Sequence, residues 1–110
     1  MMWSDRIKAA HLAVTNSVSH YAHMESDRYF VWQEDGDSQR RADNRVAERA
    51  ITGTTDLYTK MEFDPWAEAF EKALDDHGIS WYLNSVQYEE DTGFIHHEWV
   101  WEVDCGADQV

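Results

Sequence analysis

The segment from residue 80 to residue 103 constrains the fold most, because it predicts two long strands joined by a tight turn. The runs 81–89 and 94–103 are rich in aromatic and β-branched residues, which favour strands. Residues 90–93 supply turn chemistry, and Gly93 can adopt a positive φ at no steric cost. The segment therefore predicts a β-hairpin.

The apolar residues of this hairpin also predict which surfaces are covered. In the second run, Ile95, Trp99 and Trp101 fall on one face and His96 falls on the other, so we expect one buried face and one mostly solvated face. In the first run apolar side chains occur on both faces. This pattern predicts a central strand with a helix on one side and a partner surface on the other.

Length and composition predict one domain over residues 1–110, with a flexible tail at about 104–110. No 18-residue apolar run and no signal-like start are present, so we expect a soluble protein that stays in the cytoplasm where it is made, without a membrane partner. The single cysteine, Cys105, cannot form an internal disulfide and suits a reducing compartment.

The charge distribution narrows the possible partners. A formal net charge of −13 argues against nucleic-acid binding through a basic face. Three interpretations stay open: a merely solvated surface, a surface that imitates DNA, and the wall of a passage through which DNA slides. The basic residues are concentrated, since four of the nine lie within ten positions: Arg40, Arg41, Arg45 and Arg49. Such polarity suits head-to-tail self-association or an acidic partner.

In the first half of the chain, helical spacing predicts an amphipathic helix over residues 5–21, with Ser4 as its N-cap. Strand-forming residues predict a strand over 28–34, and the acidic run 35–38 predicts a solvated loop that ends it. A second long strand is predicted over 44–60. Gly53 at its middle indicates a bulge or a close backbone approach.

A second helix is predicted over residues 65–77. Asp64 is placed as its N-cap and Pro65 at its first position, and Gly78 follows its end. Its outer face is acidic, and we assign three of these carboxylates, together with the four arginines, to a candidate interface: Glu68, Glu71 and Asp75.

The element order predicts an α+β domain of the order α-β-β-α-β-β, with two helices on one face of a four-stranded antiparallel sheet. The predicted core is Ile7, Val14, Val18, Ile51, Leu57, Trp66, Phe70, Leu74, Ile95, Trp99 and Trp101.

The sequence predicts no catalytic, cofactor-binding or metal site, and we expect no enzyme. His96 and His97 are adjacent on a strand and so point to opposite faces, which prevents them from sharing a ligand. His11, His20 and His23 lack ligands at suitable spacing. No nucleophile-elbow, zinc-protease, P-loop or dinucleotide-binding motif occurs.

Several motifs lie between residues 30 and 103: the strand ITGTTDLYTK, the acid-capped helix from Asp64, the WYLNSVQYE strand and the DTGFIHHEWVWEV hairpin, preceded by FVWQEDG and ADNRVAE. Together they resemble the tail terminator and tail-completion proteins of the head-tail joining region of long-tailed bacteriophages and prophages.

This resemblance implies a structural virion protein of the tail or neck, present in the host cytoplasm during assembly. It implies a ring, typically of six copies, that caps the tail tube and meets the head connector or completion protein while DNA passes through unbound.

Two other functions stay open. An acidic DNA mimic would block a DNA-binding enzyme, and it needs carboxylates spaced like phosphates along an elongated monomer or dimer. An aromatic-lined module would bind a sugar or a peptide. Neither predicts a ring, so the oligomeric state separates them from the head-tail joining function.

Overall fold

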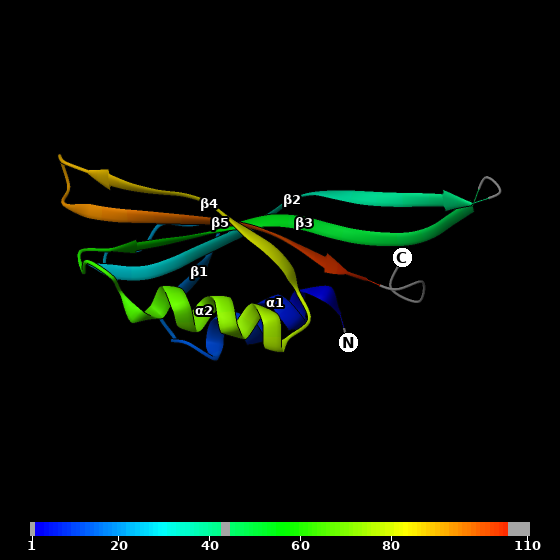
Figure 1. Ribbon diagram of the computed structural model, residues 1–110, viewed down its shortest axis with the longest axis horizontal. Helices are drawn as coiled ribbons and strands as arrows, with labels where there is room; N and C mark the ends of the chain where they lie inside the picture. The colour runs from blue at the N-terminus through cyan, green and yellow to red at the C-terminus, as the bar shows by residue number, and fades with distance from the viewer. Residues whose placement is uncertain (1, 43–44, 106–110) are drawn as a thin grey trace.

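Two helices cover one face of a five-stranded sheet (Figure 1). The computed structural model describes residues 2–42 and 45–105, and for residues 38–42 and 45–48 it describes the backbone alone. In chain order the elements are α1 (Trp3–Leu12), β1 (Val18–His20), β2 (Arg28–Ala42), β3 (Arg45–Thr59), α2 (Pro65–Asp76), β4 (Ser80–Glu89) and β5 (Phe94–Asp104).

The α+β class is confirmed, but the four-stranded antiparallel sheet is wrong. The strand order is β1-β2-β3-β5-β4, and β1 pairs parallel to β2 in the register Val18↔Phe30, so the sheet is mixed. The extra strand comes from the predicted first helix, which ends at Leu12 rather than at 21. The chain turns at Thr15, whose hydroxyl accepts a hydrogen bond from the Ser17 N–H. Residues 18–20 then pair with the edge of β2 as β1.

The acidic run at 35–38 is also part of a strand, which corrects the predicted loop. β2 continues through it and pairs with β3 as far as Ala42↔Arg45. A register shift between Glu34 and Gly36 absorbs the extra residue. Cross-strand pairing thus overrides the local turn preference of this segment.

The continuation of β2 and β3 forms a projecting hairpin at one end of the molecule (Figure 1). The last pair between β3 and β5 is Ala50↔Asp104, and beyond it the described strands pair only with each other. We call this hairpin the arm, residues 39–42 and 45–48. It contributes to an elongated molecule with extents of 52 × 23 × 22 Å.

The close approach predicted at Gly53 is confirmed. Gly53 pairs with Trp101 across β3 and β5, and a Cβ atom at Gly53 would clash with the Trp101 ring and with the Gln33 carbonyl oxygen. Any larger residue at this position would displace the buried indole, so the close approach requires glycine.

The predicted start of the second helix is confirmed. The Asp64 carboxylate accepts a hydrogen bond from the Trp66 N–H and pairs with Arg28, whose guanidinium lies 3.7 Å from the centre of the Trp66 ring. Burial alone would raise the pKa of Asp64, but the hydrogen bonds from Arg28, Trp66 and Thr59 lower it below its ordinary value.

The hairpin of β4 and β5 is confirmed, but the central position predicted for β4 is wrong. β5 lies between β3 and β4, and β4 is the edge strand. The apolar residues on both faces of β4 reflect incomplete cover by the helices rather than a central place, since Tyr82, Leu83, Val86 and Tyr88 are all exposed.

Most of the predicted core is buried between the helices and the sheet: Ile7, Ile51, Leu57, Phe70, Leu74, Trp99 and Trp101. Val14, Val18 and Trp66 pack against it half-buried, whereas Ile95 is half-buried outside the cluster. The core also contains residues that were not predicted: Phe30, Trp32, Ile79, Val103 and Cys105. Cys105 follows β5 and donates its N–H to the Arg49 carbonyl oxygen; residues 106–110 of the predicted flexible tail lie outside the described residues.

His11 is a fully buried core residue with a complete set of partners. Its Nδ1 lies 2.7 Å from the Ile7 carbonyl oxygen, which can only accept, so Nδ1 carries the proton. Its Nε2 therefore accepts from the Thr55 hydroxyl, which in turn accepts from Trp101 Nε1. Burial lowers the pKa of His11 to about 4, so the ring is neutral near pH 7.

Candidate assembly surfaces

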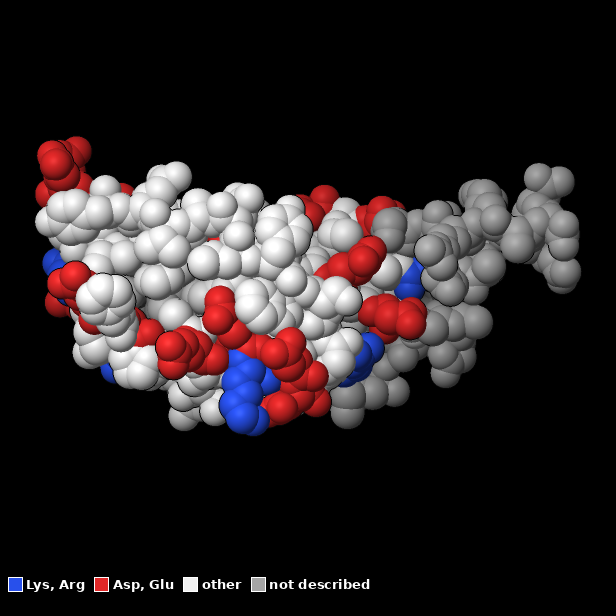
Figure 2. Space-filling view, viewed as in Figure 1, with Lys and Arg blue, Asp and Glu red and all other residues white. Residues whose placement is uncertain are grey.

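One end of the sheet exposes apolar side chains on the side that the helices cover elsewhere. We call Phe63, Leu83, Val86 and Tyr88 the end patch; their exposed fractions are 90, 43, 51 and 64%. Figure 2 shows that the surface over β4 carries few charged side chains and is bordered by the acidic β4–β5 turn and by charged residues of α2. A cluster of large exposed apolar residues is typical of an interaction surface.

A groove of about 310 Å³ lies between the N-terminal half of α2 and the strands β4 and β5. Phe63, Leu83, Val86 and the Trp99 ring line it. Glu68 and Glu71 of α2 also line it, which makes the groove apolar with an acidic rim on the α2 side.

His97 lines the same groove, and one of its ring nitrogens makes no hydrogen bond to the described residues. Its Nε2 is buried and has no hydrogen-bond partner among the described residues. The ring stacks on Trp99, and burial lowers the pKa of His97 below its ordinary value, so the ring is neutral near pH 7. A buried polar atom without a partner indicates a group that is completed by something outside the described chain.

Phe63 is the most unusual residue of the end patch. It adopts a φ of 54°, a left-handed conformation that is costly for a bulky side chain, and its ring is 90% exposed. An apolar residue just before an N-cap ordinarily packs against the fourth residue of the helix, but here that residue is Glu68. Phe63 therefore gains little from the fold of its own subunit.

The edge of β4 offers a further docking element. β4 is ten residues long, and among the described strands only β5 pairs with it, so its outer backbone groups are available to another strand. This edge borders the groove, because Leu83 and Val86 belong to β4. Backbone pairing and apolar contact can thus occur at the same place.

The face of the sheet opposite the helices carries both aromatic and charged side chains. His96 lies there, with Nε2 2.7 Å from an Asp56 carboxylate oxygen and Nδ1 3.5 Å from Glu89. The hydrogen bond to Asp56, with the nearby Glu89, raises the pKa of His96 although partial burial opposes this. His96 and His97 lie on opposite faces of the sheet, as predicted.

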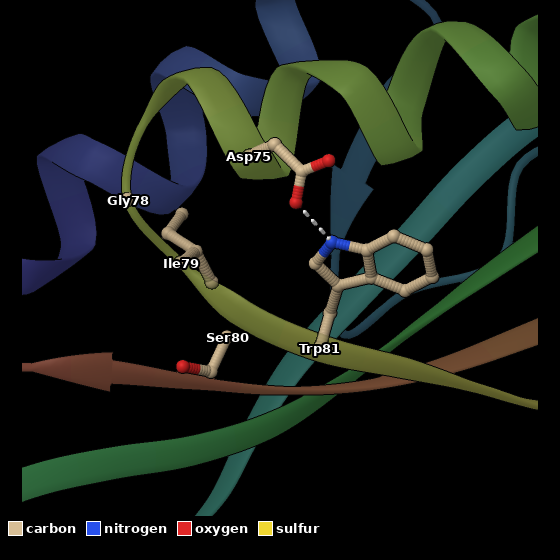
Figure 3. A pocket seen from close by; sticks show the side chains of 5 residues that line it. All are labelled: Asp75, Gly78, Ile79, Ser80 and Trp81. Carbon is tan, nitrogen blue, oxygen red and sulfur yellow. Dashed lines mark hydrogen bonds between the residues drawn. The ribbon is translucent and has the colours of Figure 1, made fainter.

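Two of the three predicted interface carboxylates accept hydrogen bonds from tryptophans of the sheet. Trp99 Nε1 donates to Glu71 at 2.9 Å, and Trp81 Nε1 donates to Asp75 at 2.8 Å (Figure 3). Glu68 is exposed at the start of α2. The sequence pattern marks all three as outward-facing, but it gives no signal for the indole contacts.

The predicted basic segment lies on the arm and at its base. Arg49 at the base bonds the Asp37 carboxylate at 3.1 Å. Arg40, Arg41 and Arg45 are backbone positions of the arm, and their side chains lie outside the described residues. The arm and the β4–β5 turn are at opposite ends of the molecule (Figure 1), so the basic segment is far from the groove of the same subunit.

Within residues 2–42 and 45–105, no group of three or more His, Cys, Asp or Glu side chains is placed to hold a metal ion. No described helix combines the length and the apolar character needed to span a membrane.

These features define an α+β fold with two helices on one face of a mixed sheet and a projecting hairpin. A chain of the solved structure described as the virion of a native gene transfer agent particle is similar in fold, with a TM-score of 0.60 over 96% of this chain and 92% of that chain. Sequence identity is 10%, so the likeness concerns the fold alone. No protein-family model and no curated protein sequence matches the chain.

Proposed function

We propose that this protein is a structural virion protein at the head-tail junction of a phage or prophage. In this function a ring of copies ends or completes the tail tube and joins it to the head connector. The observation that carries the proposal is the fold shared along nearly the whole chain with a component of a virion particle. The sequence resemblance to tail terminator and tail-completion proteins independently favours the same setting.

The shape and surface of the molecule fit a protein that works by assembly. The molecule is elongated, with a projecting arm at one end and the exposed end patch at the other. Such differing ends suit a heterologous contact, in which one surface of a copy meets another surface of the next. The partners are then identical copies, six by the resemblance, with the tail tube protein and the head connector protein.

The charge suits a ring through which DNA passes without being held. A subunit with a net charge of −13 gives a ring with a strongly negative field, which physiological salt screens over about 8–10 Å. We therefore expect no binding of duplex DNA at low salt. An electrophoretic shift with the purified protein would contradict a passive passage.

The acidic DNA mimic is the second candidate, favoured by the same charge on an elongated molecule. The two functions differ in what the loss of the gene does. Without a head-tail joining protein, cells that carry the phage genome accumulate filled heads and separate tails. Without a DNA mimic, complete particles still form.

Electron microscopy of lysates from a deletion strain tests the proposal. The expected result is separate heads and tails, with joined particles restored when the gene is supplied from a plasmid. Joined particles in normal numbers from the deletion strain would overturn the head-tail joining function.

A further inference from the structure

We propose that the arm of one copy docks on the groove and the β4 edge of the next copy, so that subunits associate head to tail. This inference rests on the proposed function in one respect, which is that the occupant of the groove is a second copy within a ring. It specifies the two surfaces that meet and the residues that anchor them.

The arm pairs with no other described element of its own subunit. Beyond Ala50 it is a two-stranded ribbon among the described strands, and an isolated two-stranded hairpin is marginally stable in water. Its outer edge is open as well, because β1 pairs with β2 only as far as His20↔Trp32. A strand or a surface from another molecule would supply the missing support.

Three features in and beside the groove would be satisfied by a docked hairpin. The Phe63 ring is exposed on a strained backbone, the His97 Nε2 lacks a partner among the described residues, and the β4 edge is open to a further strand. A docked hairpin edge would pair with β4, cover Phe63 and offer a hydrogen-bonding group to His97. One occupant thus accounts for three separate features.

Charge complementarity identifies that occupant as a second copy. Residues 39–49 hold four arginines against Asp43 and Glu48, a formal charge of +2, so the whole-chain charge of −13 leaves −15 for the rest. Glu68 and Glu71 line the groove on the α2 side, whereas Lys60 and Glu62 both line the adjoining hollow, whose charges balance. The chain therefore carries its own cationic segment opposite an acidic rim.

The placement of the two surfaces makes the contact propagate. The arm projects from the end of the 52 Å molecule opposite the β4–β5 turn (Figure 1), whereas the groove lies between α2 and the strands β4 and β5, so the arm does not reach the groove of its own copy. Each docked copy leaves one free arm and one free groove. Repetition closes into a ring when the rotation between copies divides a full turn, and otherwise continues as a filament.

The test uses two variants that each disable one surface. Arg40→Glu/Arg41→Glu reverses the arm, and Glu68→Lys/Val86→Lys places cations in the groove at two exposed positions. The control for the groove variant is Ala22→Lys/Glu25→Lys. It also replaces one apolar residue and one glutamate by lysine, at exposed positions near the other edge of the sheet. Circular dichroism and thermal melting establish that each variant is folded.

Sedimentation velocity over a range of concentrations gives the outcome. We expect the wild type and the control to self-associate alike, and each disabled variant to stay monomeric with a dissociation constant raised at least about tenfold. Mixed in equal amounts, the two disabled variants should associate again, because the intact arm of the groove variant meets the intact groove of the arm variant. The glutamates of the altered arm and the lysines of the altered groove also attract each other, so the mixture is not limited to a 1:1 dimer.

Several results would overturn this docking. The docking is wrong if the wild type stays monomeric up to about 1 mM. It is also wrong if either disabled variant assembles normally, or if the mixture of the two variants stays monomeric. If the groove variant fails to complement the deletion strain while the arm variant succeeds, the groove receives another virion protein. The docking would then be refuted while the deletion phenotype still supports the head-tail joining function.

Discussion

Replacement of Phe63 by asparagine should stabilise the monomer while weakening assembly. A left-handed backbone costs a bulky residue about 1–2 kcal/mol, and asparagine adopts this conformation more readily than most residues. Because the Phe63 ring is 90% exposed, its removal forfeits little buried apolar area. We expect a net gain of about 1 kcal/mol in the free energy of unfolding, which raises Tm by about 4–5 °C in a chain of this size.

The assay combines thermal melting at low protein concentration with sedimentation velocity at high concentration. Tyr21→Asn is the matched control, since Tyr21 also has a positive φ of 71° and is exposed, but stacks on His20 away from the groove. Its strain relief is offset by the lost ring contact, and its assembly should be unchanged. A Phe63→Asn protein that melts lower, or that associates as tightly as the wild type, would refute the reasoning.

Three further predictions concern the fold. The pKa of His11 is about 4 in the folded protein, below its ordinary value of 6.5. The free energy of unfolding is therefore unaffected by this group above about pH 6.5 and falls as the pH decreases towards 4, by about 2–3 kcal/mol at pH 4.5. An NMR titration of the His11 ring with a midpoint near 6.5 would contradict this. Gly53→Ala should cost about 1–3 kcal/mol in urea unfolding, because the added methyl group meets Trp101 and the Gln33 carbonyl, and an unchanged midpoint would refute that contact. Phe70→Ala should cost about 3–5 kcal/mol, since Phe70 is fully buried, and an unchanged Tm would show that α2 does not pack as described.

Local patterns predicted the second half of the chain well. The sequence from Asp64 to Val103 combines a capped helix and a hairpin, and both form where the pattern places them. Capping and strand alternation act over a few residues, so they can be seen in a sequence. The close approach at Gly53 was predicted as one of two alternatives, and its partner Trp101 appears only when β3 and β5 pair.

The features that were missed depend on pairing between distant segments. β1 exists because residues 18–20 meet Phe30 and its neighbours, although Val14 and Val18 fit a helix in the sequence. The run at 35–38 is extended because β3 lies beside it. The place of β4 at the sheet edge depends on which strand of its hairpin pairs with β3, and alternation along a strand does not specify that choice.

The candidate surfaces were predicted in part. Clustering of Arg40, Arg41, Arg45 and Arg49 was visible, and the structure adds that their backbone positions lie on the arm and at its base. The groove was not predicted, because it forms between α2 and two strands. The sequence holds one signal for Phe63 that was not used: Glu68, the fourth residue of the helix that follows, is a poor packing partner for an apolar ring.

The most direct test of the head-tail joining function is a cryo-electron microscopy reconstruction of the neck of particles from cells that encode this chain, combined with mass spectrometry of the same particles. The account predicts that the chain is present and that a ring of this α+β fold lies between the tail tube and the head connector. A neck whose density is filled by other proteins, in particles that lack this chain, would contradict the account.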